Sequence, residues 1–262
     1  MDYVNPNEAV ATIALAGGKK ANLSKKVILI GAILSGALLG FATTLALTAS
    51  TQTGLDIVGA ILFPTSFVMI LLLNLELVTG SFAILPIAYF RKETTLEPMI
   101  HNLSWAFIGN LIGGLLYAAL FSISVTSFGT VTTSPLIEKI ILVAENKTLF
   151  YQSIGAGGLV LVFVKAILCN WMVALGAIMS FMSKSTIGKI TAMWLPILIF
   201  FAQGFEHAVV NMSIIPIGML IGADIGMADW WLWNLIPVTI GNFIGAFLFV
   251  ALPLHYSKTD KI

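Results

Sequence analysis

Charged side chains are scarce in this sequence. Asp, Glu, Lys and Arg make up 10% of its 262 residues, whereas 58% are hydrophobic. A soluble domain carries roughly 25% charged residues, so this chain has too little charge to cover a water-facing surface. The net charge of only +1 excludes a nucleic-acid-binding protein with a basic excess, and the apolar content excludes a disordered chain. The composition indicates a chain whose solvent is the lipid bilayer.

Cysteine is almost absent as well. Cys169 is the single one, so the chain forms no intrachain disulfide and no cysteine-built metal site. An enzyme within the membrane would need a nucleophile with its base, or a set of metal ligands. The one histidine in mid-segment, His207, has no cysteine or carboxylate cluster beside it. We therefore expect no enzymatic activity, no metal and no cofactor.

Long apolar segments are what the sequence has instead. A membrane-spanning helix needs roughly 20 apolar residues, whereas the strands of a membrane β-barrel are alternating segments of about 10. The apolar segments are far longer than such strands and do not alternate. The sequence predicts an all-α membrane protein with six transmembrane helices, at residues 27–49, 57–90, 100–128, 154–182, 191–222 and 231–254.

The basic residues indicate the orientation of these helices. Cytoplasmic loops of membrane proteins carry an excess of Lys and Arg. In a six-span arrangement only Lys139 and Lys147 fall in loops on one side, and the other side holds Lys19, Lys20, Lys25, Lys26, Arg91, Lys92, Lys184, Lys189, Lys258 and Lys261. Both termini are therefore expected to be cytoplasmic, in the cell membrane of a prokaryote.

The chain divides accordingly into three parts. Residues 1–26 are expected to form a cytoplasmic segment with a helix along the membrane surface. This helix begins at Pro6, after the N-cap Asn5, and ends at Gly17-Gly18. Residues 27–254 form the transmembrane domain, and residues 255–262 form a cytoplasmic tail.

Two of the apolar segments are too long for one crossing. Residues 57–90 and 191–222 would each be about 50 Å long as a helix, at roughly 1.5 Å per residue, against a hydrocarbon core of about 30 Å. Both contain Pro, Gly and polar residues near the middle. Irregular backbone at membrane depth persists only where protein buries it or where it lines a cavity. We therefore expect two interrupted helices that face a path through the protein.

An internal repeat relates the two halves of the chain. Gly109-Asn110-Leu111-Ile112-Gly113 recurs as Gly241-Asn242-Phe243-Ile244-Gly245, and Glu76 has a counterpart in Glu206. Each half, about 27–128 and 154–254, contains three spans, and an odd number inverts the second copy relative to the first. Transporters with such inverted repeats bind substrate where the broken helices meet.

Ionisable residues inside membrane spans are functional candidates, because charge is costly to bury in hydrocarbon. His207 is the strongest, since imidazole exchanges a proton near neutral pH. In a helix Asn211 would share a face with it, and the pair could bind a small anion or its acid. The alternative is a structural histidine bonded to a neighbouring carbonyl.

The other polar residues have competing interpretations. Glu76 and Glu206 are expected to shape the loops at the breaks by accepting hydrogen bonds from backbone amides; the alternative is a proton relay or cation site. Thr79-Gly80-Ser81 is typical of an N-cap that opens a half-helix toward an anion. Lys165 and Lys147 could draw anions into a vestibule, although Lys165 could instead extend to the membrane interface.

Taken together, these motifs resemble the formate/nitrite transporter family of anion channels. The resemblance covers nearly the whole chain, and its pieces are Pro6-Asn7-Glu8, Glu76-Leu77-Val78-Thr79-Gly80, Gly109-Asn110, Lys165-Ala166-Ile167-Leu168-Cys169-Asn170-Trp171, Gly204-Phe205-Glu206-His207, Asn211-Met212, Ile215-Pro216 and Pro237-Val238-Thr239-Ile240-Gly241-Asn242.

The resemblance implies an aquaporin-like protomer with one pore, assembled as a homopentamer. His207 would be the central pore residue and Thr79 its partner from the other loop. The cytoplasmic constriction would be formed by Leu77, Val78, Phe67 and Val173, and the periplasmic one by Phe63 and Phe200. Val78 stands where family members often have Phe.

The predicted function is transport of small monovalent anions of weak acids across the bilayer. Apolar constrictions would reject an anion and pass its neutral acid, because a bare charge at the bilayer centre costs at least about 2.5–3.5 kcal/mol. The proton would come from solvent or through His207. Formate is the expected substrate; nitrite, hydrosulfide, acetate and lactate are the alternatives. A water or glycerol pore should show paired Asn-Pro-Ala motifs, which the sequence lacks.

Overall fold

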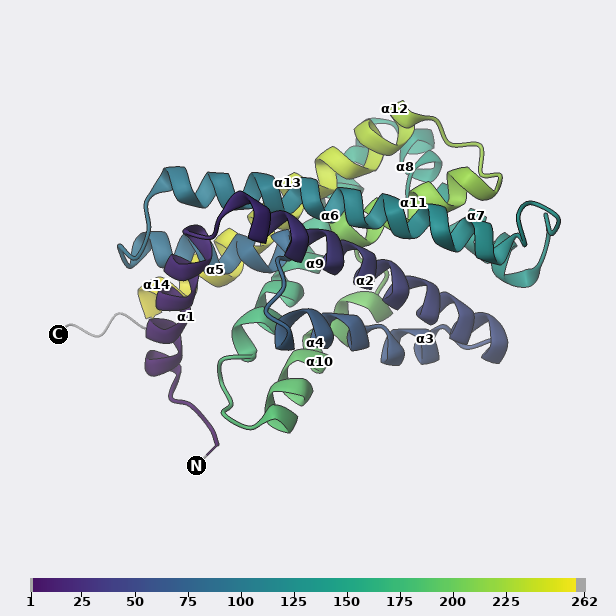
Figure 1. Cartoon of the computed structure of the whole chain (residues 1–262). Helices are drawn as coiled ribbons and strands as arrows, with labels where there is room; N and C mark the ends of the chain where they lie inside the picture. The colour runs from purple at the N-terminus through teal and green to yellow at the C-terminus, as the bar shows by residue number, and fades with distance from the viewer. Residues whose placement is uncertain (1, 258–262) are drawn as a thin grey trace.

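A computed structural model of the chain describes residues 2–257, and helices form its regular structure (Figure 1). In these residues the one pairing of extended backbone is an isolated bridge between Tyr3 and Ser183. The helices are α1 (Pro6–Ala21), α2 (Lys25–Thr53), α3 (Asp56–Leu62), α4 (Pro64–Leu72), α5 (Val78–Phe90), α6 (Leu96–Val125), α7 (Pro135–Asn146), α8 (Leu149–Ile154), α9 (Ala156–Met179), α10 (Thr186–Ala202), α11 (Ala208–Ile221), α12 (Met227–Trp230), η1 (Trp231–Leu235), α13 (Ile236–Ala246), η2 (Phe247–Ala251) and α14 (Leu252–Ser257).

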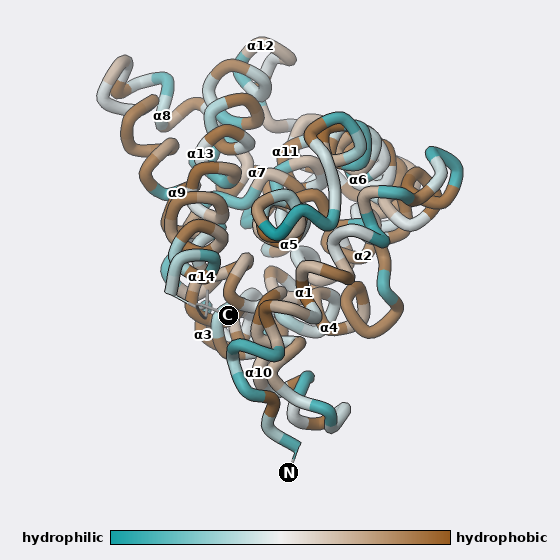
Figure 2. The backbone as a smooth tube through the Cα atoms, turned by 90° about the vertical axis from the view of Figure 1, so that its left-hand side faces the viewer, coloured by the Kyte–Doolittle hydropathy of each residue, from teal (hydrophilic) through white to brown (hydrophobic). Residues whose placement is uncertain are grey.

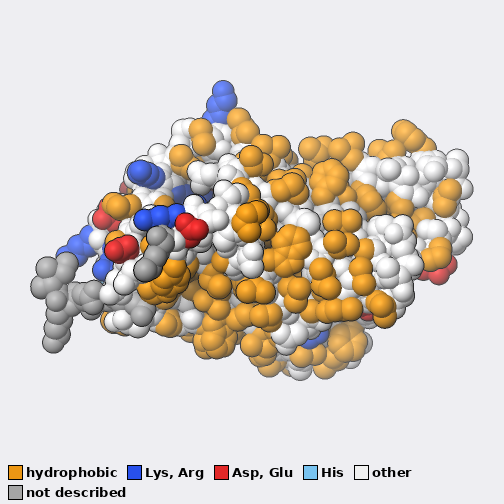
Figure 3. Space-filling view, turned by 90° about the horizontal axis from the view of Figure 1, so that it is seen from below, with side chains coloured by type: hydrophobic (Ala, Val, Ile, Leu, Met, Phe, Trp, Pro, Cys, Tyr) orange, Lys and Arg blue, Asp and Glu red, His pale blue; other side chains and the backbone are white. Residues whose placement is uncertain are grey.

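Four helices are long and apolar enough to cross a membrane: α2, α6, α9 and the continuous run from α12 to α14, which includes the π-helical turns η1 and η2. The helices are apolar along most of their length, and the polar residues gather in the connections (Figure 2). On the face in Figure 3, apolar side chains cover the middle, and charged side chains collect toward one end. The chain is therefore a multi-pass membrane protein.

The remaining apolar helices are short and come in pairs separated by a break. α4 ends at Leu72 and α5 begins at Val78, whereas α10 ends at Ala202 and α11 begins at Ala208. The sequence predicts an interruption in both segments, and the backbone leaves the helical conformation in both.

The two breaks use the same backbone turn. Asn74 (φ 52°) and Gly204 (φ 63°) adopt the left-handed conformation just past the helix end. In each turn the amide of the next residue, Leu75 or Phe205, donates back to the carbonyl five residues earlier, at 2.9 and 3.2 Å. This is a Schellman motif, which satisfies the free carbonyls of a helix end. Gly and Asn are the residues that adopt this conformation at least cost.

Pairs of long helices pack closely through glycine. α6 lies against α2, and α13 lies against α9. A Cβ added at Gly113 would lie 2.0 Å from the Ile33 carbonyl oxygen, and one at Gly245 would lie 2.3 Å from that of Ile167. The helix backbones therefore approach each other where only glycine fits, as small residues allow in membranes.

Gly113→Ala is consequently expected to destabilise the protein by at least about 1–3 kcal/mol, because the neighbouring backbone has to move to admit one methyl group. Thermal unfolding in detergent measures the loss. Gly157→Ala in α9 is the control, since the added Cβ would meet only the end of the Ile154 side chain, at 3.2 Å. Equal melting temperatures of the two variants would contradict this account of the packing.

The N-terminal helix is longer than predicted. α1 does begin at Pro6 with Asn5 as N-cap, but it continues through Gly17 and Gly18 to Ala21 and packs against α5. A Cβ at Gly17 would be 2.8 Å from the Ile84 carbonyl oxygen in α5, and one at Gly18 would be 2.7 Å from the carbonyl oxygen of Glu93, just after α5. Both glycines therefore serve close packing and do not end the helix.

α1 and α14 lie at one end of the bundle, which we call the α1 end, and α7 lies at the other, the α7 end (Figure 1). The polar stretch that separates α6 from α9 in the sequence includes two helices, α7 and α8. Lys258 and Lys261 of the expected cytoplasmic tail lie outside the described residues.

Candidate functional site

The two breaks meet in the interior, where they bring His207 and Thr79 together. Nε2 of His207 lies 3.0 Å from Oγ1 of Thr79, and the two residues are 2% and 0% exposed. His207 is the N-cap of α11, and its Nδ1 accepts a hydrogen bond of 3.2 Å from the amide of Val210. Because Nδ1 is an acceptor, the neutral ring carries its proton on Nε2 and donates it to Thr79.

Two asparagines cap the half-helices that begin at the breaks. Oδ1 of Asn110 accepts from the amide of Val78 at 3.0 Å, and Oδ1 of Asn242 accepts from the amide of Ala208 at 2.9 Å. α5 therefore starts at Val78, with Leu77 as N-cap, and the expected cap at Thr79 is wrong. The side-chain amide of Asn110, from the neighbouring helix α6, takes the capping role at α5. The Thr79 hydroxyl is therefore available to hydrogen-bond with His207.

The two glutamates hold lysines rather than loop amides. Glu76 Oε1 accepts from Lys20 Nζ at 2.7 Å, and Glu206 Oε2 accepts from Lys147 Nζ at 2.9 Å. Both carboxylates are 3% exposed. The expectation that the carboxylates bind backbone amides is therefore wrong. They fix the loops through buried ion pairs instead, which are costly to break from one side.

A second pair of asparagines, Asn102 and Asn234, completes these ion pairs. Nδ2 of Asn102 donates to Glu76 (3.2 Å) and to the Lys20 carbonyl (2.9 Å). Nδ2 of Asn234 donates to Glu206 (3.4 Å) and, at 2.7 Å, to the carbonyl of Lys147. Sequence reasoning missed both. Each lies eight residues before the repeated Gly-Asn asparagine, so a longer comparison of the two halves would have found them.

Asn211 lies elsewhere than predicted. Its Nδ2 donates to Glu206 at 2.7 Å and to Asn234 at 2.8 Å, so the side chain joins the ion-pair network rather than His207. The prediction assumed that both residues share a helix face, but His207 precedes the helix in extended conformation (φ −113°, ψ 122°). Tyr151 also enters this network, since its hydroxyl donates to Glu206 at 2.8 Å.

Asn170 joins the two halves of the site and is another residue that sequence reasoning left without a role. Its Nδ2 donates to the carbonyl of Thr79 at 3.1 Å and to that of Asn242 at 2.8 Å. A single side chain of α9 therefore ties α5, the half-helix that follows the first break, to α13. This contact holds Thr79 in reach of His207.

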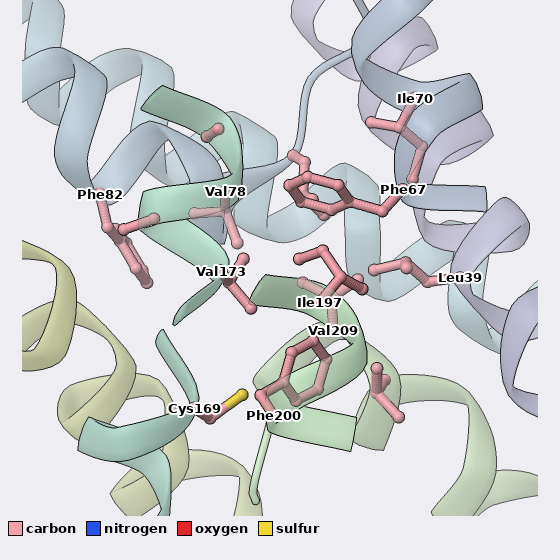
Figure 4. Packing of buried hydrophobic residues seen from close by; sticks show 14 of the residues in the cluster. Leu39, Phe67, Ile70, Val78, Phe82, Cys169, Val173, Ile197, Phe200 and Val209 are labelled. Carbon is pink, nitrogen blue, oxygen red and sulfur yellow. The ribbon is translucent and has the colours of Figure 1, made fainter. Parts of the chain in front are cut away.

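Apolar side chains lie between Thr79 and the α1 end. Phe67, Val78, Val173 and Ile197 come from four different helices and converge in Figure 4, with Val209 beside them. All are buried, as is Leu77 at the start of α5. Of this group, Ile197 and Val209 were not predicted.

Phenylalanines lie on the other side of His207. The Phe200 ring lies 5.7 Å from the imidazole in a nearly parallel orientation, and Phe63 meets Phe200 edge-on at 5.6 Å. Phe201, which the sequence also places near the second break, stacks on Phe63 at 4.0 Å. The predicted pair therefore forms part of a cluster of three rings beside the histidine.

A cavity opens on each side of these apolar layers. The α7-end vestibule has a volume of about 330 Å³, and it is lined by His207 and Phe200 together with Asp56, Lys139 and Lys147. The α1-end vestibule, of about 210 Å³, is lined by Lys19, Lys20 and Glu76. Each cavity thus has lysine in its wall; His207 lines the α7-end vestibule, and its partner Thr79 belongs to neither lining.

The two lysine candidates differ in position. Lys147 lines the α7-end vestibule, whereas Lys165 lies outside that lining, with its ammonium 5.9 Å from the centre of the Tyr151 ring. Lys165 contributes to the break through its backbone, since its carbonyl accepts from the amide of Glu206 at 3.4 Å.

The arrangement places lysines at both ends, hydrogen-bonding groups at the centre and apolar walls between them. Lysine ammonium groups can bind small anions, although Lys20, Lys139 and Lys147 each have a carboxylate partner here. A charged solute meets a large barrier at the apolar layers, whereas a small neutral acid can hydrogen-bond to Thr79 and His207. In the described residues no group of three or more His, Cys, Asp and Glu side chains is arranged to hold a metal.

Comparison with known proteins agrees with this geometry. The family model for formate/nitrite transporters matches residues 7–256. A probable formate transporter of Methanothermobacter thermautotrophicus is 32% identical, over 91% of this chain and 90% of its own length. Two solved structures have a similar fold. An FNT family ion channel has a TM-score of 0.82 at 24% identity, covering 95% of this chain and 98% of its own. A pentameric formate channel with formate bound has a TM-score of 0.72 at 22% identity, with 87% and 95% covered.

Proposed function

Since this chain belongs to the formate/nitrite transporter family, we propose that it is a channel for small monovalent anions of weak acids, with formate as its first substrate. The single observation that carries this proposal is the central contact between Thr79 and His207, which apolar residues enclose and which lies between two lysine-lined vestibules, the α7-end one being lined in part by His207. Other family substrates, nitrite among them, would use the same path.

The architecture proposed with this function has six crossings in two inverted halves, residues 27–128 and 154–254. The matched contacts support it: Asn110 and Asn242, Asn102 and Asn234, and Glu76 and Glu206 recur in the two halves, and the lysine partner of each glutamate lies just before its half. Each broken segment then counts as one crossing. With the basic residues on the cytoplasmic side, the α1 end with residues 1–26 and 255–262 faces the cytoplasm of a prokaryotic cell. The pentameric formate channel of similar fold supports a homopentamer with one pore in each protomer.

Transport is proposed to be proton-linked and centred on His207. The anion collects in a vestibule, takes up a proton, crosses the apolar layers as the neutral acid and releases the proton on the far side. We propose that the proton comes from the solvent of the vestibule rather than from the imidazole ring. Protonation of the ring would require a proton on Nδ1, which already accepts a hydrogen bond from the Val210 amide. Phe67, Leu77, Val78 and Val173 would form the cytoplasmic constriction, and Phe63 and Phe200 the periplasmic one.

Stopped-flow flux in proteoliposomes tests the function. Formate, nitrite, hydrosulfide, acetate and lactate are compared at two pH values, with glycerol as the neutral solute and protein-free liposomes as the baseline. We expect formate flux to exceed the baseline and to rise at the lower pH, as the acid fraction grows. Glycerol flux without anion flux would support an aquaporin-like pore and overturn the proposal.

A further inference from the structure

The two lysines of the α7-end vestibule are held by very different partners. Lys147 pairs with Glu206, whose carboxylate is 3% exposed and also accepts from Tyr151 and Asn211. Lys139, on α7, pairs with Asp56, whose side chain is 86% exposed. One lysine thus belongs to a buried network, and the other to a solvated pair at the mouth.

This difference decides which lysine can receive a substrate anion. The Lys139–Asp56 pair is weaker and exchanges more easily, because water solvates Asp56 and also reaches Lys139, whose side chain is 27% exposed. An anion that takes Lys147 from Glu206 would strand a buried carboxylate, which is strongly unfavourable. An anion that takes Lys139 from Asp56 leaves that carboxylate in water, where its solvation costs little.

We propose that Lys139 is the first binding site for the substrate anion at the α7-end mouth, and that Asp56 is a built-in competitor for it. The ligand is a small monovalent anion, formate or its analogues, so the inference rests on the proposed function. Asp56 lies at the start of α3 and Lys139 on α7, so the pair joins two segments at the entrance. Both residues line the cavity that leads to His207.

Competition from Asp56 keeps the affinity of Lys139 for the anion low. A channel requires low affinity at its mouth, because a tightly bound anion would not pass farther into the pore. Asp56, Lys139 and Lys147 are the Asp, Glu, Lys and Arg residues among the described lining of this vestibule. Neutralising Asp56 both frees Lys139 and makes the potential of the cavity more positive. The two effects are separable, because only the first requires Lys139.

The test compares Asp56→Asn, Lys139→Gln and the double variant, in cells that take up labelled formate. At about 0.01 M ionic strength, where charges act over about 30 Å, we expect Asp56→Asn to lower the KM for uptake about two- to fivefold and Lys139→Gln to raise it by a similar factor. In the double variant, Asp56→Asn should lower the KM by less than it does when Lys139 is present, because only its effect on the potential of the cavity remains. The KM for efflux should stay unchanged, since the pair lies at the α7 end. Asp224→Asn is the control, because Asp224 is exposed and does not line the cavity.

Three outcomes overturn the inference while leaving the proposed function intact: formate flux with an unchanged KM in Asp56→Asn, an effect of Asp224→Asn equal to that of Asp56→Asn, or additive effects in the double variant. Additivity would mean that Asp56 acts only as a general negative charge. If the unaltered protein carries no anion flux, the proposed function itself fails and this inference fails with it.

Discussion

His207→Phe is expected to reduce formate flux by about tenfold or more. The substitution removes one buried hydrogen-bond donor from the path, and the loss of such a donor costs about 1–3 kcal/mol. The substitution removes Nε2, which lies 3.0 Å from Thr79, and Nδ1, which caps α11 through Val210. The centre of the pathway then presents an apolar ring beside Phe200. Stopped-flow flux at a fixed pH, normalised to the protein inserted in liposomes, measures the change.

Two further variants separate the roles of the histidine. His207→Asn keeps an acceptor for the Val210 amide and a donor for Thr79 but cannot carry a proton. We expect it to retain most of the flux and its rise at low pH, because the proton is taken up in the vestibule; a flat pH profile would instead assign the proton to the ring. His101→Phe is the control, since His101 is an exposed residue of α6. Unchanged flux in His207→Phe would show that His207 is not on the path.

Lys147→Met is expected to cause the largest loss of stability, about 3–5 kcal/mol, because removal of one partner leaves Glu206 as an uncompensated buried charge. Tyr151 and Asn211 still donate to that carboxylate, but neither neutralises it. Thermal unfolding in detergent, followed by tryptophan fluorescence, measures the loss.

The double variant Lys147→Met/Glu206→Gln should recover a large part of that stability, since a neutral amide replaces the stranded carboxylate. Lys26→Met is the control for loss of a lysine at an exposed position. If Lys147→Met melts at the same temperature as the unaltered protein, the ion pair does not hold the second break. If the double variant is no more stable than Lys147→Met, the charge of Glu206 is not what destabilises the single variant.

Contacts over long sequence distances account for most of what the sequence could not reveal. The repeated Gly-Asn motif suggested a close helix contact, but it did not reveal that Asn110 and Asn242 cap the half-helices at the breaks. Glu76 and Glu206 were correctly related to each other, yet their partners, Lys20 and Lys147, were assigned to a basic cluster and to a vestibule. Hydropathy shows which segments lie in the membrane. It carries no information about which buried polar groups form hydrogen bonds or ion pairs with each other.

Asn211 and Lys139 show the same limit on a smaller scale. Helical spacing placed Asn211 beside His207, and an extended residue at the helix start removed the basis of that argument. Lys139 looked like an ordinary loop lysine until α7 brought it to Asp56 at the cavity mouth.

The sequence by itself determined that this chain is a membrane protein, that its regular structure is helical and that two of its long apolar segments are interrupted. It also determined the family to which the chain belongs. The first three properties follow from composition and local pattern, because apolar length, Pro and Gly act on the residues around them, whereas the family follows from the resemblance of the motifs. The family resemblance implied the pairing of Thr79 with His207, and only the tertiary structure decided that asparagines cap the breaks and that one lysine is buried while another stays exchangeable. Those outcomes depend on the distances between helices, which no local pattern contains.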